Sequence, residues 1–448
     1  MSDEPMGKDG KADSNRKTVV VIGADDHNLE MIRAIPEADQ WNIERVLEWE
    51  DVQPDHGRID FDDLYRTARE KIDALDDCPD AIIGYLDFPV TSLVALLTRD
   101  YGLSGASPEA VACCEHKYWM REIEARVFPD TAPEVRAINP FSTRKARGEV
   151  PPFPFWLKPV KAHSSVLGFM IEEDEDLDRA LHACRQKLHF FGEPFNDFLA
   201  HLEKPGGSAE VGGNYAVAEE LVSAKRQFTL EGYVWQGEVT IYGAVDSIRT
   251  GEHSSSFSRY QYPARLPDRI LDKATEMTEK ILDAFGYDGS PFNIEFFWNP
   301  DTDGLRILEV NPRISKSHSP LFKMVDGVSH HKIAIDLSLG RQPEMPHRQG
   351  DDEIAAKFMW RSVEADGIVK RIPDEEEISD LQQLLPDLDL TILVEKEQRL
   401  SSMFYQDSYS YELAVIFLGG DSEEMLEDAY QMCIDCLSIH LKPLPESA

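Results

Sequence analysis

The feature that most constrains this chain is a pair of apolar runs, at 292–298 and 305–311, separated by a turn rich in Asn, Pro, Asp and Gly. Two β-prone runs around such a turn predict an antiparallel hairpin. Because alternate side chains of a strand share one face, Glu309 and Asn311 project together, and Glu295 of the partner strand reaches the same side. The pattern therefore predicts two carboxylates and an amide oxygen that converge on one face of the hairpin.

Oxygen ligands of this kind suit Mg²⁺, which takes one or two carboxylates and leaves its other positions to water and substrate phosphates. We therefore predict Glu295, Glu309 and Asn311 as metal ligands. The alternative is a solvated acidic hairpin without a ligand, because short motifs produce false positives.

Glu295 and the run Glu-Val-Asn-Pro-Arg at 309–313 resemble the metal-binding end of the ATP-grasp ligases. The Ser-Lys-Ser-His segment at 315–318 is similar to the same region of carbamoyl phosphate synthetase. The resemblance implies ATP as cofactor, with Mg²⁺ or Mn²⁺, as two ions, bridging its phosphates. It also implies catalytic roles for Arg313 and Lys316, with Arg313 beside an acyl phosphate or the substrate carboxylate.

Two lysines extend the resemblance toward the nucleotide. Lys158 lies in an apolar strand pattern at 154–159, where an unpaired buried cation is costly, so we expect it to face a cleft and an anion. It matches a strand lysine of the family that binds an ATP phosphate. Lys117 matches a second lysine that contacts the nucleotide, and its alternative role is that of a surface lysine on an amphipathic helix.

The segment at 215–222 resembles the hinge strand that binds adenine and ribose in this family. Either Glu219 or Glu220 is the hinge acid, and Glu220 aligns better. The resemblance implies that the backbone of Leu221 and Val222 contacts the adenine edge.

Two positions depart from the family pattern. The loop at 160–168, expected to cover the phosphates, contains one Gly where the family loop is glycine-rich, although Ser164 and Ser165 remain as phosphate donors. The expected ribose-binding Glu is replaced by Gln227, which still hydrogen-bonds hydroxyl groups, and Glu231 is a competing candidate.

Strand and helix patterns alternate, which predicts an α/β chain with a small parallel sheet near its N-terminus. No G-x-G-x-x-G follows the first strand at 18–22, so a nicotinamide cofactor is not expected. The resemblance implies an ATP-grasp fold with a Rossmann-like domain before it and an α+β lobe after it. The expected divisions are a disordered tail at 1–17, the Rossmann-like domain at 18–115, the ATP-grasp lid at 116–222, the catalytic lobe at 223–345 and the C-terminal α+β domain at 346–448.

Local patterns predict four further segments. A single helical pattern runs over 107–126, with Ser107 and Pro108 at its start. The segment at 190–214 is longer than a tight connection needs, and such insertions are functional or mobile. A polar segment at 252–263 is either a solvated loop or a border of the acceptor substrate. An amphipathic helix at 266–285 ends at Gly286.

The charge of the chain excludes some partners. With 83 acidic and 46 basic side chains in 448 residues, the formal charge is -37, which repels nucleic acid and anionic membranes. The N-terminal segment has no apolar core of a signal peptide, and no run approaches a membrane span. Six scattered cysteines fit a reduced, cytoplasmic chain, and Cys433 and Cys436 are interpreted as buried helix cysteines. A homodimer is the default expectation.

The resemblance implies an ATP-dependent ligase that joins a small-molecule carboxylate to an amine through an acyl phosphate, releasing ADP and phosphate. The sequence does not identify the acid or the amine. One alternative is a biotin carboxylase-like or carbamoyl phosphate synthetase-like enzyme that activates bicarbonate through carboxyphosphate. Another is an ATP-binding sensor or scaffold without turnover, since a fold does not fix a function.

Overall fold

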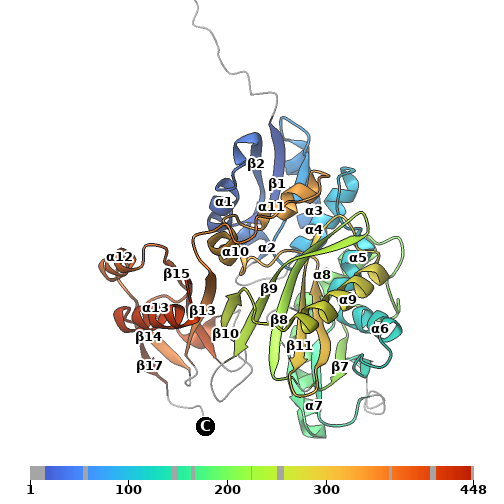
Figure 1. Cartoon of the computed structure of the whole chain (residues 1–448). Coiled ribbons are helices and arrows are strands. Elements are labelled where there is room, and N and C mark those ends of the chain that lie inside the picture. The colour runs from blue at the N-terminus through green and yellow to red at the C-terminus, as the bar shows by residue number, and fades with distance from the viewer. Residues whose placement is uncertain are drawn as a thin grey trace, which may run out of the picture.

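The computed structural model describes residues 16–53, 59–142, 150–162, 167–222, 224–249, 257–362, 366–403 and 410–444. Within them the strands form four sheets, of three, four, eight and two strands. In Figure 1 the N-terminal part lies at the top, a lid at the bottom, a long central sheet on the right and the C-terminal part on the left. The expected α/β class is confirmed.

The N-terminal part contains the predicted parallel sheet. Its strands are β1 (Lys17–Ala24), β2 (Trp41–Glu48) and β3 (Ala81–Ile83), in the order β2-β1-β3. β1 is buried along its whole length except at Lys17, as expected for a parallel strand covered on both faces. The helices here are α1 (Asp26–Arg33), α2 (Trp49–Val52), α3 (Phe61–Asp73) and α4 (Val90–Asp100), with a 3₁₀ turn η1 (Ala38–Gln40).

The single helix predicted at 107–126 is wrong, because the chain breaks at His116 into α5 (Pro108–Glu115) and α6 (Lys117–Val127). Ser107 caps α5 as predicted, accepting a hydrogen bond from the Ala110 N–H. His116 is extended, with φ -87° and ψ 93°, and its imidazole caps α6 through the Trp119 N–H. Its other ring nitrogen lies 2.9 Å from the Val211 carbonyl oxygen, a distant contact that the local pattern does not contain.

The lid is an antiparallel sheet in the order β4-β7-β5-β6, covered by α7. Its elements are β4 (Val135–Ile138), β5 (Phe155–Pro159), β6 (Phe169–Ile171), α7 (Asp174–Lys187) and β7 (Ala216–Glu220). The insertion at 190–214 contains a packed helix, α8 (His189–Ala200), whose Phe198 ring lies 5.7 Å from that of Phe61 in α3. This part of the insertion therefore joins the lid to the N-terminal part.

The central sheet has the order β12-β11-β8-β9-β10-β13-β16-β15. Its first five strands along the chain are β8 (Arg226–Trp235), β9 (Glu238–Arg249), β10 (Phe257–Tyr262), β11 (Pro291–Asn299) and β12 (Gly304–Asn311), with the helices α9 (Asp268–Phe285), α10 (Ser319–Asp326) and α11 (His331–Ser338). β11 and β12 form the predicted antiparallel hairpin, which is confirmed. α9 ends as predicted at Gly286, whose φ of 65° suits glycine.

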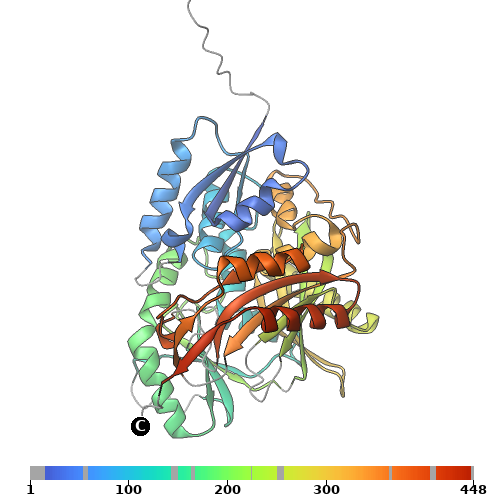
Figure 2. The same cartoon turned by 90° about the vertical axis from the view of Figure 1, so that its left-hand side faces the viewer.

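In the C-terminal part, β13, β16 and β15 continue this sheet, while β14 and β17 form a separate two-stranded sheet. Its elements are β13 (Ile354–Ser362), β14 (Gly367–Arg371), α12 (Glu375–Leu384), β15 (Asp389–Ile392), η3 (Leu400–Ser402), β16 (Tyr411–Gly420), α13 (Glu423–Cys436) and β17 (His440–Pro443). β10 pairs with both β9 and β13, so the solvated-loop alternative for 252–263 is wrong for 257–262, and the substrate-border alternative stays a prediction. Arg259 of β10 binds Glu423 and Glu427 of α13. Figure 2 shows the helices of this part beside its long strand.

Two expectations from composition have structural outcomes. Cys433 is buried in α13, but Cys436, at the end of that helix, is exposed, so the expectation that both are buried is wrong for Cys436. Within the described residues, no helix has the length and apolar character needed to span a bilayer.

Candidate functional site

A cavity of about 790 Å³ lies where the N-terminal part, the lid and the central sheet meet. All the predicted site residues within the described part of the chain line it: Lys117, Lys158, Glu219, Glu220, Leu221, Val222, Gln227, Glu295, Glu309, Asn311, Arg313 and Lys316. Ser164 and Ser165 lie outside the described residues. The structure thus brings together side chains that are up to 199 positions apart in the sequence, from Lys117 to Lys316.

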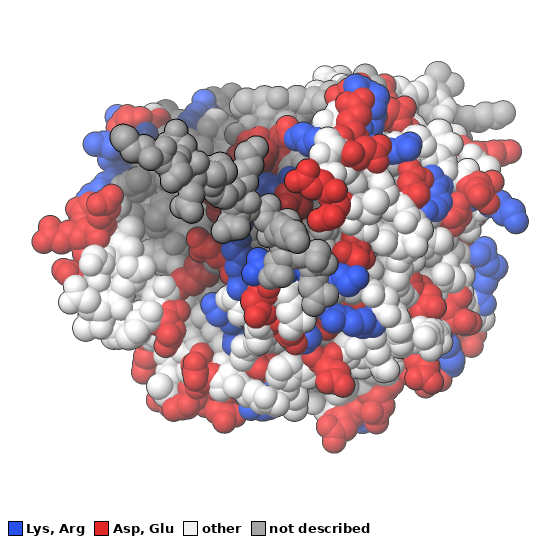
Figure 3. Space-filling model, turned by 90° about the horizontal axis from the view of Figure 1, so that it is seen from above, with Lys and Arg blue, Asp and Glu red and all other residues white. Residues whose placement is uncertain are grey.

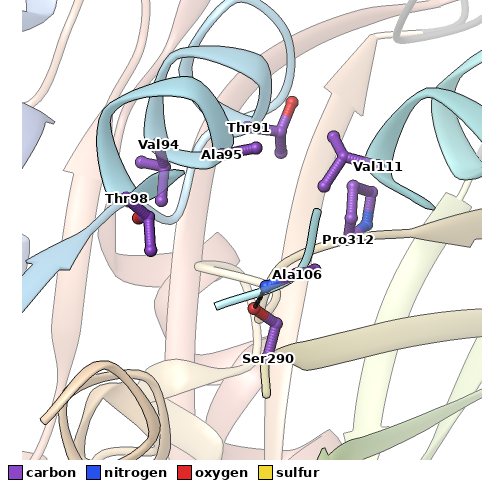
Figure 4. A pocket seen from close by; sticks show the side chains of 9 residues that line it. Thr91, Val94, Ala95, Thr98, Ala106, Val111, Ser290 and Pro312 are labelled. Atoms are coloured by element: carbon purple, nitrogen blue, oxygen red, sulfur yellow. Dashed lines mark hydrogen bonds between the residues drawn. The ribbon is translucent and has the colours of Figure 1, made fainter. Parts of the chain in front are cut away.

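A second cavity, of about 30 Å³, lies behind Pro312. Figure 4 shows it between α4 and the residues around Ala106 and Ser290, with the Ala106 N–H donating to Ser290 Oγ at 2.8 Å. A space of this size holds about one water molecule. It is therefore too small to be a substrate site.

The lid wall of the large cavity carries a compensated carboxylate. Lys158 Nζ lies 2.7 Å from Glu219 Oε2, and Arg121 Nε donates to Glu219 Oε1 at 2.9 Å. These side chains are 13%, 8% and 3% exposed. Although burial opposes ionisation, the charges of Arg121 and Lys158 hold the pKa of Glu219 at about 2. Burial lowers the pKa of Lys158, while Glu219 opposes that change.

Arg121 also fixes the position of the lid wall relative to the hairpin. Its guanidinium donates to the carbonyl oxygens of Ile307 and Leu308 in β12, both at 2.9 Å. Glu124, one turn along α6, is its second acidic partner. One buried side chain therefore joins α6, β7 and β12, and its role was not predicted from the sequence.

The two candidate hinge acids occupy different environments. Glu219 is buried and paired with Lys158, whereas Glu220 ends β7 with an exposed side chain that accepts a hydrogen bond from the Glu134 N–H at 3.3 Å. Because strand neighbours point to opposite faces, only one of the two shares a face with Lys158. The assignment of Glu220 as the hinge acid stays a prediction.

The hairpin wall carries uncompensated carboxylates. Glu295 and Glu309 are cross-strand partners in β11 and β12. Gln227 Nε2 donates to Glu295 Oε2 at 2.6 Å, and Arg249 in turn donates to Gln227 Oε1 at 2.8 Å. Burial and the charge of Glu309 raise the pKa of Glu295 to about 8. Asn311 completes the wall, donating to Asn293 Oδ1 at 3.2 Å.

The hairpin wall fits a divalent cation. The charge of Glu309 beside Glu295 raises the pKa of Glu295, so an added cation would relieve the repulsion between the two carboxylates, and the Asn311 amide lies beside them, its nitrogen 3.5 Å from Glu309 Oε1. Among the residues that the structure describes, no group of three or more His, Cys, Asp or Glu converges as a metal site. Two Glu and one Asn therefore stay the predicted donor set, one that suits a Mg²⁺ site with positions left to water and phosphate.

Arg313 and Lys316 lie at the end of the cavity nearest the N-terminal part. Arg313 donates to Asp87 Oδ1 from Nε at 2.9 Å and from Nη2 at 2.7 Å. Lys316 Nζ lies 4.0 Å from the ring centroid of Trp49, a cation–π contact. Burial lowers the pKa of Lys316 to about 8. This end of the cavity therefore carries two basic side chains, of which Arg313 is paired with Asp87.

Sequence reasoning missed Lys161, which is buried, lines the cavity and forms an ion pair with Glu115. Burial lowers the pKa of Lys161 to about 8. Lys117 donates from Nζ to the Ala162 carbonyl oxygen at 2.8 Å, so both lysines fix the first residues of the loop predicted at 160–168. The signal was present: a cation three positions after Lys158, in a largely apolar segment, has the same burial cost.

Of the two ribose candidates, only Gln227 lines the cavity. Glu231 is fully buried, and its Oε1 lies 2.7 Å from His318 Nδ1 and accepts from Asn293 Nδ2 at 2.7 Å.

The cavity brings several Lys and Arg side chains together in a molecule that is acidic as a whole. Figure 3 shows Asp and Glu spread widely over one face of the molecule, with Lys and Arg among them.

Comparisons with known proteins show what the chain is similar to. The model of the ATP-grasp domain family matches residues 151–320. The carbamoyl phosphate synthase large chain of Caldanaerobacter subterraneus is 40% identical over 107 residues, which is 23% of this chain and 9% of that protein. The chain thus covers less than a tenth of the length of that relative.

Two solved structures extend the likeness to the whole chain. The L-amino acid ligase from Bacillus licheniformis has a TM-score of 0.68 at 15% identity, over 96% of this chain and 99% of that one. The biotin carboxylase from Campylobacter jejuni has a TM-score of 0.61 at 13% identity, over 96% and 94%. At such identities the likeness shows the fold, and the expected ATP-grasp fold is confirmed.

Proposed function

We propose that this chain, which has the ATP-grasp fold and an ATP-grasp domain at residues 151–320, is an ATP-dependent carboxylate–amine ligase. The observation that carries the proposal is one cavity of about 790 Å³ that joins three features. They are a lid cation at Lys158, a carboxylate pair at Glu295 and Glu309, and a cationic end at Arg313.

In this proposal the lid wall binds ATP and the hairpin wall binds the metal ions. Lys158 and Lys117 bind phosphate oxygens of ATP, and the backbone of Leu221 and Val222 contacts adenine. Glu295, Glu309 and Asn311 hold one or two Mg²⁺ ions. When bound, Mg²⁺ supplies positive charge that offsets the charge of the phosphates.

Arg313 positions the acid substrate. Its guanidinium, fixed by two hydrogen bonds to Asp87, holds the substrate carboxylate in line with the γ-phosphorus. A carboxylate oxygen then attacks that phosphorus, the bond to ADP breaks, and an acyl phosphate forms. An amine attacks the acyl carbon, a C–N bond forms, and inorganic phosphate leaves.

The test is a release assay for ADP and phosphate over pairs of amino acids, short peptides and polyamines. Glu309→Gln keeps the shape of the wall and removes one charge, so we expect turnover to fall by at least about 100-fold. Glu279→Gln, on the exposed face of α9, is the matched control and should leave turnover unchanged. Unaltered turnover in Glu309→Gln would remove the metal assignment.

A second candidate is bicarbonate activation, favoured by the identity to carbamoyl phosphate synthase over 107 residues. It predicts ATP hydrolysis that depends on bicarbonate and not on an organic acid. A nucleotide sensor predicts a third outcome, in which calorimetry gives tight ATP binding and no candidate substrate stimulates hydrolysis.

A further inference from the structure

A buried carboxylate and an imidazole form a pair at the edge of the cavity. Glu231 of β8 is 0% exposed, and its Oε1 lies 2.7 Å from His318 Nδ1. The same oxygen accepts from Asn293 Nδ2 at 2.7 Å and from the Ser315 N–H at 3.3 Å. The Glu231 carboxylate therefore fixes the 315–318 segment through the Ser315 N–H and His318 Nδ1.

The pair fixes the tautomer of His318. Although burial opposes ionisation, the hydrogen bond from His318 and the charges around it lower the pKa of Glu231. An ionised carboxylate only accepts, so Nδ1 of His318 carries a hydrogen, and in the neutral form of the ring the lone pair is on Nε2. His318 Nε2 has no hydrogen-bond partner among the described residues, and His318 lines the cavity.

The same network connects His318 with the hairpin wall. Asn311 donates to Asn293, Asn293 donates to Glu231, and Glu231 binds His318. The imidazole is thus connected to the candidate metal ligand Asn311 through two residues, Asn293 and Glu231, and it lies on the segment that also carries Arg313 and Lys316. It is therefore close to the place where an acyl phosphate would form.

The surroundings of His318 come from several elements. The edge of the Tyr260 ring of β10 lies against it, with centroids 5.3 Å apart. His330 Nδ1 is 3.9 Å from Glu231 Oε2, and burial lowers the pKa of His330 to about 3, so that ring is neutral. The remaining polar neighbours of this network are Tyr242 on Glu231 Oε2 and Lys357, which donates to Ser317 Oγ at 3.1 Å and lies over the Tyr260 ring.

We propose that His318 is the general base that deprotonates the amine substrate and that Glu231 is its positioning residue; the assignment rests on the proposed ligase function. An ammonium substrate gives one proton to His318 Nε2, and the freed lone pair attacks the acyl carbon. The C–N bond forms as the C–O bond to phosphate breaks, and phosphate leaves with that electron pair and takes the second proton that the nitrogen loses. A positioned base of this kind contributes about 100- to 10,000-fold.

The test compares two nucleophiles. Most amines are protonated at pH 7 and need a base, whereas hydroxylamine is largely uncharged there and traps an acyl phosphate directly as a hydroxamate. For His318→Asn we expect amide formation to fall by at least about 100-fold while hydroxamate formation stays close to that of the wild type. His182→Asn, in the exposed part of α7, is the matched control for loss of an imidazole and should change neither.

Each other outcome is decisive. If both products fall together in His318→Asn, the histidine is structural; if neither falls, it has no role in proton transfer. A wild type that forms no hydroxamate with any carboxylate would overturn the ligase function, and this assignment with it.

Chemical rescue keeps the assignment testable if a variant folds poorly. Added imidazole should restore amide formation by the folded fraction of His318→Ala and should not restore that of Glu309→Gln. Glu231→Gln keeps the buried shape but loses the charge, so we expect a lower amide-to-hydroxamate ratio than in the wild type. An unchanged ratio in Glu231→Gln would overturn its positioning role.

Discussion

The lid wall and the hairpin wall of the cavity hold their carboxylates in opposite electrostatic states. On the lid wall, Arg121 and Lys158 surround Glu219 and hold its pKa at about 2. On the hairpin wall, Glu309 and burial raise the pKa of Glu295 to about 8, and its hydrogen-bond donor is the neutral amide of Gln227. Burial opposes ionisation of both acids, so the difference in their pKa values comes from the charges placed beside each one.

The difference tells what each wall adds to binding. The lid wall pairs its two cations, Arg121 and Lys158, with two acids, Glu219 and Glu124, so its charges are compensated within the protein. The hairpin wall has an excess of negative charge that a proton or a divalent cation relieves. The charges of the lid wall are therefore compensated by the protein itself, whereas those of the hairpin wall are compensated by the ligand that binds there.

The largest expected effect is a loss of stability when the lid wall loses Arg121. Arg121→Met removes a cation that serves Glu219, Glu124 and two β12 carbonyl oxygens, leaving Glu124 buried without an ion-pair partner among the described residues. We expect a loss of about 3 to 5 kcal/mol in the free energy of unfolding, because breaking a buried ion pair strands its partner. Urea denaturation followed by tryptophan fluorescence measures it.

The control for this change is Arg179→Met. Arg179 pairs with Asp176 on α7 but is 71% exposed, so its loss should change stability by less than about 1 kcal/mol. Equal urea midpoints for the two variants would mean that the Arg121 network is not what holds the lid wall to the hairpin.

The next effect separates binding from stability on the same wall. Lys158→Met leaves Glu219 paired with Arg121, so the fold should persist, while ATP loses a charge-assisted hydrogen bond of about 1.5 to 3 kcal/mol. Calorimetry should give an ATP dissociation constant raised by about 10- to 100-fold. Lys280→Met, an exposed position on α9, should bind ATP like the wild type. Full ATP affinity in Lys158→Met would make its pair with Glu219 purely structural.

Local sequence patterns predicted the parts of this site that depend on one strand or one turn. The hairpin follows from two apolar runs and their turn, and the side-chain alternation within it places Glu309 with Asn311. Lys158 follows from the cost of burying a cation in an apolar strand. Ser107 and Gly286 follow from helix-end chemistry.

The rest depends on contacts between distant segments. The break at His116 requires the Val211 carbonyl oxygen, which is 95 positions away. The environment of Glu219 is set by the pairing of β7 with β5, since a shift of one residue would exchange it with Glu220. Arg121 reaches β12 across 186 positions. Such pairs have no signature in either segment alone.

The raised pKa of Glu295 in the hairpin wall predicts that the stability of the fold depends on pH. Since the pKa of Glu295 is raised from 4.5 to about 8 in the folded chain, its protonation stabilises the fold fully below pH 4.5. That contribution is lost as the pH rises through about 8. In EDTA, Glu295→Gln should remove this loss and be more stable than the wild type at pH 8 by on the order of 1 kcal/mol.

Urea midpoints at pH 6, 7 and 8 for both proteins measure this difference. Mg²⁺ should raise the midpoint of the wild type at pH 8 and leave that of Glu295→Gln much less changed, because ligand binding to the folded state adds stability. A variant that is less stable than the wild type at every pH would mean that Glu295 is compensated like Glu219, and the contrast between the walls would fail.

The smallest effect tests how far the neutral amide supports Glu295. Gln227→Leu removes the donor to Glu295 Oε2, so the pKa of Glu295 should rise further, and the fall in stability should extend to a higher pH, by less than about one unit. Urea midpoints from pH 6 to 9 in EDTA follow that shift, with Gln383→Leu on the exposed side of α12 as the control. A shift to lower pH would show that Arg249 moves onto Glu295 when the amide is removed, since a direct cation would then compensate the hairpin wall as Lys158 compensates Glu219.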